Sequence, residues 1–220
     1  MNLIPLYFFP QMITSFTEQN FHQLCDELAG RDASFSTIIS DFGYPPFWSR
    51  PNTFESLIHI ILEQQVSLAS ALSALQKLKE KTGKISAENL LVLTDEELKA
   101  CYFSRQKTVY ARDLAENLIT GKLDLEELAQ LPDDEIRQKL IAIKGIGNWT
   151  TDIYLMMILH RTDIFPVGDL AAINALKKLQ NLPKETSKEK LLQIAEAWKP
   201  FRTIATLLLW HEYLSRRKIK

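Results

Sequence analysis

Apolar residues recur every three or four positions along most of the chain, which is the spacing of one face of an α-helix. One apolar stripe runs from Phe21 to Leu28, and another runs from Phe54 to Leu62. No segment alternates apolar and polar residues for long, and no Asn-Gly pair marks a tight β-hairpin. We therefore predict an all-α fold of about ten helices joined by short loops, without internal repeats.

Local sequence signals mark several helix starts. Ser15 with Glu18, and Thr94 with Glu97, have the spacing of a capping box, in which two side chains satisfy the first N–H groups of a helix. Pro132 is followed by two aspartates, a pattern typical of the first turn of a helix. These signals predict helix starts just after residues 15, 94 and 132.

The stretch KGIG, residues 144–147, predicts a tight hairpin between a helix ending near Ile143 and one beginning at Asn148. Gly145 and Gly147 permit backbone angles that side chains disfavour, and they leave the backbone open to an approaching group. The N–H groups at such a turn and at the next helix start point outward, which is a geometry that binds phosphate. The alternative is an ordinary helical hairpin with a glycine cap.

The overall charge limits how this chain could bind nucleic acid. Its 220 residues carry a net charge of −1, and 46% of them are hydrophobic. This is enough for a core in one domain or in two lobes that share a cleft. A protein without excess positive charge does not coat nucleic acid electrostatically, so any phosphate contact must be local. Basic residues concentrate in Lys177-Lys178 and at 215–220, where a solvated surface is the simpler interpretation.

Location and cofactors follow from two further features. The apolar run over residues 1–13 is interrupted by Pro5 and Pro10 and lacks a basic start, so we expect a soluble cytoplasmic protein without a membrane partner. Cys25 and Cys101 fall on apolar helix positions and are expected to be reduced core thiols. The cysteines and histidines lack the spacing of iron–sulfur or zinc sites, so we predict no cofactor and no side-chain metal site.

Five blocks of the sequence together resemble one known family. They are ILEQQVSLASA (61–71), SRQKTVYARDLA (104–115), LIAIKGIGNWTTD (140–152), FPVGDLA (165–171) and AEAWKPFRTIATLLLW (195–210). In this order they are similar to the helix-hairpin-helix DNA glycosylases with a Gly/Pro-rich loop and a catalytic aspartate (HhH-GPD), and within these to the 3-methyladenine DNA glycosylase II branch. The resemblance implies two helical lobes around a DNA-binding cleft. Residues 54–155 would form the lobe that ends in the hairpin, and 1–53 with 160–220 the other.

The resemblance implies that Asp169 is the catalytic carboxylate. Cleavage of an N-glycosidic bond develops positive charge on the deoxyribose, which a fixed carboxylate can stabilise while it orients or deprotonates water. From the residues alone, Asp169 could instead be only the N-cap of a helix at 170–179, and the two roles are compatible. Glu63 is a rival carboxylate without a matching role in the family.

Trp149 sets the expected reaction subtype. Bifunctional relatives such as endonuclease III have a lysine there that attacks the sugar and leads to strand cleavage, so a tryptophan implies a monofunctional enzyme without AP lyase activity. An indole also attracts the positive charge of N-alkylated purines. The base-pocket candidates are Trp149, Ile153, Tyr154, Trp198 and Phe201. Core packing is the alternative for the two tryptophans and Phe201, and Ile153 stands where relatives have a tyrosine.

The resemblance also assigns the DNA contacts. The phosphate-binding positions are Lys144, Gly145, Ile146, Gly147 and Thr150. A monovalent cation is often held by backbone carbonyls in family hairpins, and the matching positions are Ile141, Ile143 and Ile146. Gln65 matches the wedge, a side chain that fills the gap left by an extruded base. An exposed glutamine at a helix end is the alternative.

These assignments predict a monomeric, monofunctional DNA glycosylase. It would hydrolyse the N-glycosidic bond of alkylated purines of the 3-methyladenine type in duplex DNA by base flipping, as the first step of base excision repair. Two alternatives stay open, because the contents of the pocket rather than the hairpin set specificity. One is a glycosylase for deaminated or oxidised bases, and the other is a non-catalytic DNA-binding module that uses the hairpin alone.

Overall fold

The computed structural model describes residues 14–218, and within this range no β-strand is formed. The helices are α1 (Glu18–Arg31), α2 (Ala33–Phe42), α3 (Phe54–Glu63), α4 (Leu68–Thr82), α5 (Ala87–Leu91), α6 (Asp95–Ala100), α7 (Arg105–Ile119), α8 (Leu125–Ala129), α9 (Asp133–Ile141), α10 (Asn148–Met157), α11 (Leu170–Leu179), α12 (Lys188–Ala195), the 3-10 helix η1 (Glu196–Trp198) and α13 (Arg202–Lys218). The predicted all-α fold is confirmed. The apolar run at 1–13 and the last two residues of the basic 215–220 segment lie outside the described residues.

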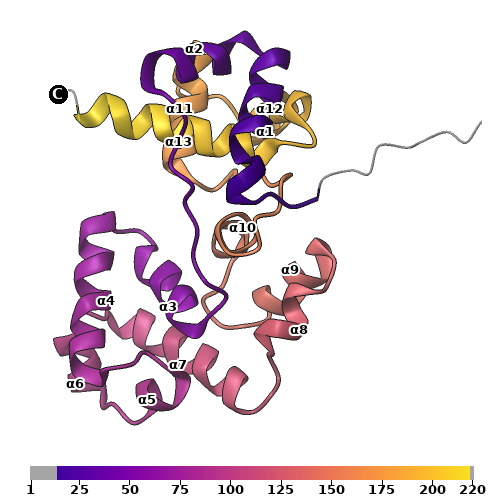
Figure 1. Cartoon of the computed structure of the whole chain (residues 1–220). Helices are drawn as coiled ribbons and strands as arrows, with labels where there is room; N and C mark the ends of the chain where they lie inside the picture. Colours follow the sequence, from indigo (N-terminus) through magenta and orange to yellow (C-terminus); the bar gives the residue numbers. More distant parts are fainter. Residues whose placement is uncertain (1–13, 219–220) are drawn as a thin grey trace, which may run out of the picture.

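The helices form two groups, with α10 between them (Figure 1). In the lower group, α3 packs against α4 and α7, and α5 and α6 also pack against α7. In the upper group, α13 packs against α1, α2 and α11. Helix α10 contacts α3 and α9 of the lower group. The lobe boundaries expected from the sequence, 54–155 against 1–53 plus 160–220, stay a prediction.

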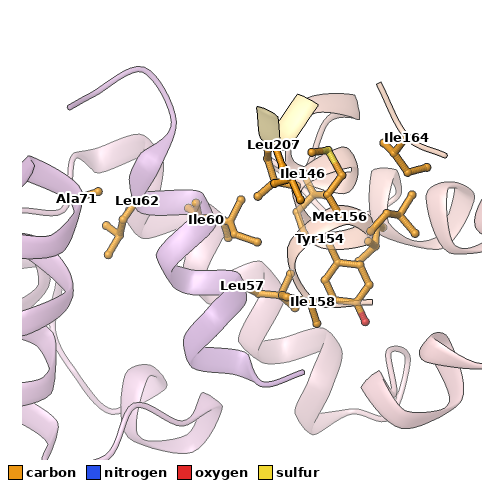
Figure 2. Packing of buried hydrophobic residues seen from close by; sticks show 14 of the residues in the cluster. Leu57, Ile60, Leu62, Ala71, Ile146, Tyr154, Met156, Ile158, Ile164 and Leu207 are labelled. Atoms are coloured by element: carbon orange, nitrogen blue, oxygen red, sulfur yellow. The ribbon is translucent and has the colours of Figure 1, made fainter. Parts of the chain in front are cut away.

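Helix α10 is buried on nearly all sides, because every residue over 150–156 is buried. Leu57 and Ile60 lie on the side of α3 that faces Tyr154 of α10 (Figure 2). Burial of each such large apolar side chain contributes about 1.5–3 kcal/mol to folding. The N-terminal end of α10, and the hairpin that precedes it, are therefore fixed to the core.

One of the predicted capping boxes is present and the other is wrong. The N–H of Thr94 donates to Glu97 Oε2 at 2.9 Å, and the N–H of Glu97 donates to Thr94 Oγ1 at 3.2 Å. Helix α1 does not begin after Ser15, because the backbone of Ser15 is held in an antiparallel bridge to the segment after α10. It begins after Thr17, whose N–H donates to Asn20 Oδ1 at 2.8 Å.

The two cysteines lie in the core, as expected from their positions in the sequence. Cys25 and Cys101 are buried and free of disulfide bonds. Burial raises the pKa of the Cys25 thiol to about 12, so this group is an unreactive thiol. Among residues 14–218, no helix is both long enough and apolar enough to cross a membrane.

Candidate functional site

The expected hairpin joins α9, which ends at Ile141, to α10, which begins at Asn148. Gly145 has a φ of +86°, and a Cβ atom at this residue would lie 2.0 Å from Cγ of Tyr110 on α7. No side chain fits at that distance, so the tyrosine ring packs directly on the backbone of the turn. Gly147 has a φ of −109° and nothing within 4 Å of an added Cβ, so it contributes open space rather than a special backbone angle.

The start of α10 presents main-chain donors at the surface. Gly147 is the N-cap, without a side-chain cap, and the first backbone hydrogen bond of the helix runs from the N–H of Thr151 to the carbonyl of Gly147. The N–H groups of Asn148, Trp149 and Thr150 come before Thr151 in the helix, so they have no acceptor within it. Gly147 and Asn148 are exposed. Together with the positive end of the helix dipole, these groups suit an anion.

The other residues expected to bind phosphate differ in what they can offer. Lys144 is exposed, but its N–H donates to Asp113 Oδ2 at 2.8 Å, so its ammonium group is the free donor. Ile146 is buried and its N–H donates to the carbonyl of Ile143 at 3.1 Å. Ile146 therefore closes the turn. Thr150 is only 2% exposed as a whole residue, and its Oγ1 accepts from Gln64 Nε2 at 3.0 Å, so the structure places it beneath the surface rather than at a phosphate site.

Asp169 lies where three helices meet. It is the N-cap of α11, and its Oδ1 accepts from the N–H of Ala172 at 2.8 Å. The same Oδ1 accepts from the indole N–H of Trp210 on α13, and Oδ2 accepts from the indole N–H of Trp149 on α10, each at 3.0 Å. The predicted cap is confirmed. Charge-assisted bonds from three donors hold this carboxylate in one orientation.

Sequence reasoning did not identify Trp210 or Trp48 as site residues. The Trp48 ring meets the Trp210 ring edge-on, with centroids 6.3 Å apart and planes at 71°. Trp48, Trp149 and Trp210 are each half-buried, so they pack against the protein and still reach solvent. The sequence signal for Trp210 is weak, because it follows three leucines in an apolar helix and looks like a core residue. Only the fold brings it to Asp169.

The structure places the remaining base-pocket candidates in the core rather than at a surface. Each is 3% exposed or less: Ile153, Tyr154, Trp198 and Phe201. The Tyr154 hydroxyl donates to Asn52 Oδ1 at 3.0 Å, and the Trp198 indole donates to Asp32 Oδ2 at 3.1 Å. The core-packing alternative describes Trp198 and Phe201, so we retain Trp149 alone of the five.

Glu63, the rival carboxylate, is already engaged. Its two oxygens accept from both terminal nitrogens of Arg50 at 2.6 and 2.9 Å, and its side chain is 7% exposed. Burial, reinforced by the Arg50 charge, lowers the pKa of the neighbouring His59. A buried, bidentate ion pair holds Glu63 in a structural role. Over residues 14–218, no group of three or more His, Cys, Asp or Glu side chains is arranged to hold a metal ion.

Gln65 lies in the turn between α3 and α4, and its side chain is exposed. Its φ is +57°, the left-handed region that residues with side chains rarely adopt.

A second feature lies beside the hairpin, where a cavity of about 380 Å³ is lined by Arg105, Gln106, Val109, Tyr110 and Lys144. Two basic side chains thus border the open space next to the turn.

An all-α fold with a glycine hairpin beside a capped carboxylate defines a helix-hairpin-helix protein. Residues 58–200 match the family described as "HhH-GPD superfamily base excision DNA repair protein", and the chain belongs to this family.

Relatives with known names are similar over most of this chain. DNA-3-methyladenine glycosylase 1 of Schizosaccharomyces pombe is 31% identical over 207 residues, which cover 91% of this chain and 89% of that protein. DNA-3-methyladenine glycosylase of Bacillus subtilis is 30% identical over 172 residues, 73% of this chain and 57% of that protein. The solved structure of the S. pombe 3-methyladenine DNA glycosylase in complex with abasic DNA has a TM-score of 0.79 at 31% identity, and covers 86% of this chain and 95% of that one.

Proposed function

We propose that this protein is a monofunctional DNA glycosylase that hydrolyses the N-glycosidic bond of alkylated purines of the 3-methyladenine type in duplex DNA. This reaction is the first step of base excision repair. The observation that carries the proposal is the carboxylate of Asp169, which two indole N–H groups and a helix start hold in place. The names of the relatives support the substrate class.

The chemistry needs a negative charge fixed beside the sugar. As the bond from C1′ to the purine nitrogen breaks, the electron pair leaves with the base, and C1′ becomes electron-poor. Asp169 stabilises this oxocarbenium-like state, and the oxygen of a water molecule then forms the new bond to C1′ while the water gives up one proton, which the Asp169 carboxylate can accept. The indole faces of Trp149 and Trp210 attract an alkylated purine, which carries positive charge. Gln65 fills the gap that the extruded base leaves.

The absence of a lysine at position 149 is the reason to expect no strand cleavage. An AP lyase needs an amine that attacks C1′ to form a Schiff base. Trp149 occupies the position after the hairpin, and its indole nitrogen is a hydrogen-bond donor to Asp169. Lys144 lies in the hairpin, where it binds phosphate. The product is therefore an abasic site in an uncut DNA strand.

DNA is held by the hairpin rather than by the overall charge of the protein. Lys144, Gly145 and Gly147 provide an ammonium group and open backbone, and the N–H groups at the start of α10 complete the phosphate site. A monovalent cation on the carbonyls of Ile141, Ile143 and Ile146 would add a positive charge to this phosphate site.

The protein acts as a monomer in the cytoplasm, nucleoid-associated if bacterial, with DNA between its two lobes.

Chromatography of free bases released from methylated duplex DNA tests the proposal. Wild type should release 3-methyladenine or 7-methylguanine, and Asp169→Asn should release neither while it still binds DNA. The asparagine oxygen can keep the helix cap, while the NH2 group that replaces the second oxygen cannot accept from Trp149, so this variant removes the charge and one indole contact. Nicks should appear only after alkali. Binding without release of any methylated base would reject the substrate class, and deaminated and oxidised bases would be tested next.

A further inference from the structure

Gln64, the neighbour of the wedge residue, is tied to the hairpin. Its side-chain amide donates from Nε2 to the carbonyl oxygen of Gly145 at 2.9 Å and to Thr150 Oγ1 at 3.0 Å. The first acceptor lies in the turn that faces DNA in the proposed function, and the second lies in the first turn of α10. One amide group therefore links the wedge turn to both halves of the phosphate-binding hairpin.

The turn itself needs such support. Gln65 has a left-handed backbone, and a residue with a side chain keeps such a conformation only where its surroundings fix it. The residues before it are each held from another element. Lys107 Nζ of α7 donates to the carbonyl of Leu62 at 2.6 Å, and Arg50 binds Glu63. Burial lowers the pKa of Lys107, in keeping with its position under the turn.

The three anchors differ in what they attach to. Lys107 ties the end of α3 to another helix of the lower group. Arg50 belongs to the segment that leads into α3, and its N–H donates to the carbonyl of Met157 at the end of α10. Gln64 alone of the three reaches the hairpin. Of these three anchors, it is therefore the one that connects the wedge turn to the phosphate site.

We propose that Gln64 is a positioning residue, which fixes Gln65 in register with the phosphate bound at the hairpin. This inference rests on the proposed function, because it requires DNA at the hairpin and a wedge at Gln65. A glycosylase must place its wedge at the base step next to the phosphate that it holds. A misplacement of about 1 Å in such a group reduces rates by up to roughly 100-fold.

A double-mutant cycle on single-turnover base release tests this role. Gln64→Met keeps the length of the side chain and removes its hydrogen bonds, and Gln65→Ala removes the wedge. We expect Gln64→Met alone to slow release by about 10- to 100-fold, with affinity for undamaged duplex unchanged. In the Gln65→Ala background the same substitution should cost little further, because there is no wedge left to position. Gln23→Met, on α1 in the other group of helices, is the matched control.

Three results would overturn the inference. The first is a double variant whose rate of base release is reduced by the product of the two single-variant factors, which would mean that Gln64 acts independently of Gln65. The second is a wild-type rate in Gln64→Met, and the third is a wild-type rate in Gln65→Ala, since the wedge would then lie elsewhere. If wild type releases no methylated base, the proposed function fails separately. The same cycle is then measured as affinity for duplex DNA that contains an abasic-site analogue.

Discussion

The carboxylate of Asp169 accepts hydrogen bonds from donors on three helices, and the two indole donors come from α10 and α13. A hydrogen bond to a charged group contributes about 1.5–3 kcal/mol. In the proposed function the hydrogen bond from Trp210 orients the carboxylate for reaction. Trp210→Phe keeps an aromatic ring but removes this hydrogen bond. We expect base release to slow by roughly 10- to 100-fold in single-turnover assays, with DNA binding retained.

Trp198→Phe is the matched control for this prediction. Its indole also donates to an aspartate, Asp32, but in the core of the upper group. The control should lower thermal stability and leave base release per folded molecule near the wild-type rate. Equal losses of activity in the two variants would show that Trp210 acts through stability alone.

At the scale of residues, local roles could be predicted and long-range partners could not. Asp169 was expected at a helix cap because an Asp before an apolar helix is a signal within a few residues. Trp210 and Gln64 act through contacts with residues more than 40 positions away. For Trp198 and Phe201 the sequence leaves both the pocket and the core open, because it does not distinguish an aromatic residue in the core from one in a pocket nearby.

The hairpin depends on one glycine more than on the other. In Gly145→Ala the new Cβ would overlap the ring of Tyr110, and alanine is strained at a φ of +86°. We expect a loss of about 1–3 kcal/mol in the free energy of unfolding and weaker binding to duplex DNA. Denaturant titration and fluorescence anisotropy measure the two effects.

Gly147→Ala provides the comparison at the same turn. Its φ of −109° suits any residue, and its Cβ would meet open space. Its free energy of unfolding should stay within about 0.5 kcal/mol of wild type. A large destabilisation at Gly147, or none at Gly145, would contradict this account of the turn. The KGIG pattern could predict the turn, but not Tyr110 beneath it, because that ring comes from a distant helix.

For the whole molecule, a net charge of −1 means that DNA affinity must come from a few local contacts. Each phosphate neutralised by a cation contributes about 0.9 to the slope of log affinity against log salt. We expect Lys144→Ala to reduce that slope by about this amount in titrations of undamaged duplex. Lys188→Ala, at the start of α12, should leave it unchanged. If Lys144→Ala and Lys188→Ala give the same slope, Lys144 does not contact a phosphate.

Global stability should also depend on a half-buried histidine, His160. Burial lowers the pKa of His160, so the unfolded chain binds its proton more readily than the folded chain does. The contribution of His160 is complete above its ordinary pKa of about 6.5 and is lost as the pH falls from there. We expect His160→Asn to reduce the decline in Tm between pH 7 and pH 5. Asparagine tolerates the φ of +51° at this residue.

Circular dichroism melts at several pH values measure this effect. The difference in slope corresponds to at most about 1.4 kcal/mol per pH unit, the limit for one proton. The pH prediction is rejected if His160→Asn and wild type decline in parallel.

The junction of α10, α11 and α13 at Asp169 determines what happens in a cell to copies of this protein that lack Asp169. In the proposed function Asp169 is needed for the reaction, and the fold needs it too, because replacing it by alanine removes a helix cap and two indole contacts together. Such a copy would unfold more often and be degraded sooner in a cell. It would then not persist on lesions that it cannot process, where it would shield them from other repair enzymes.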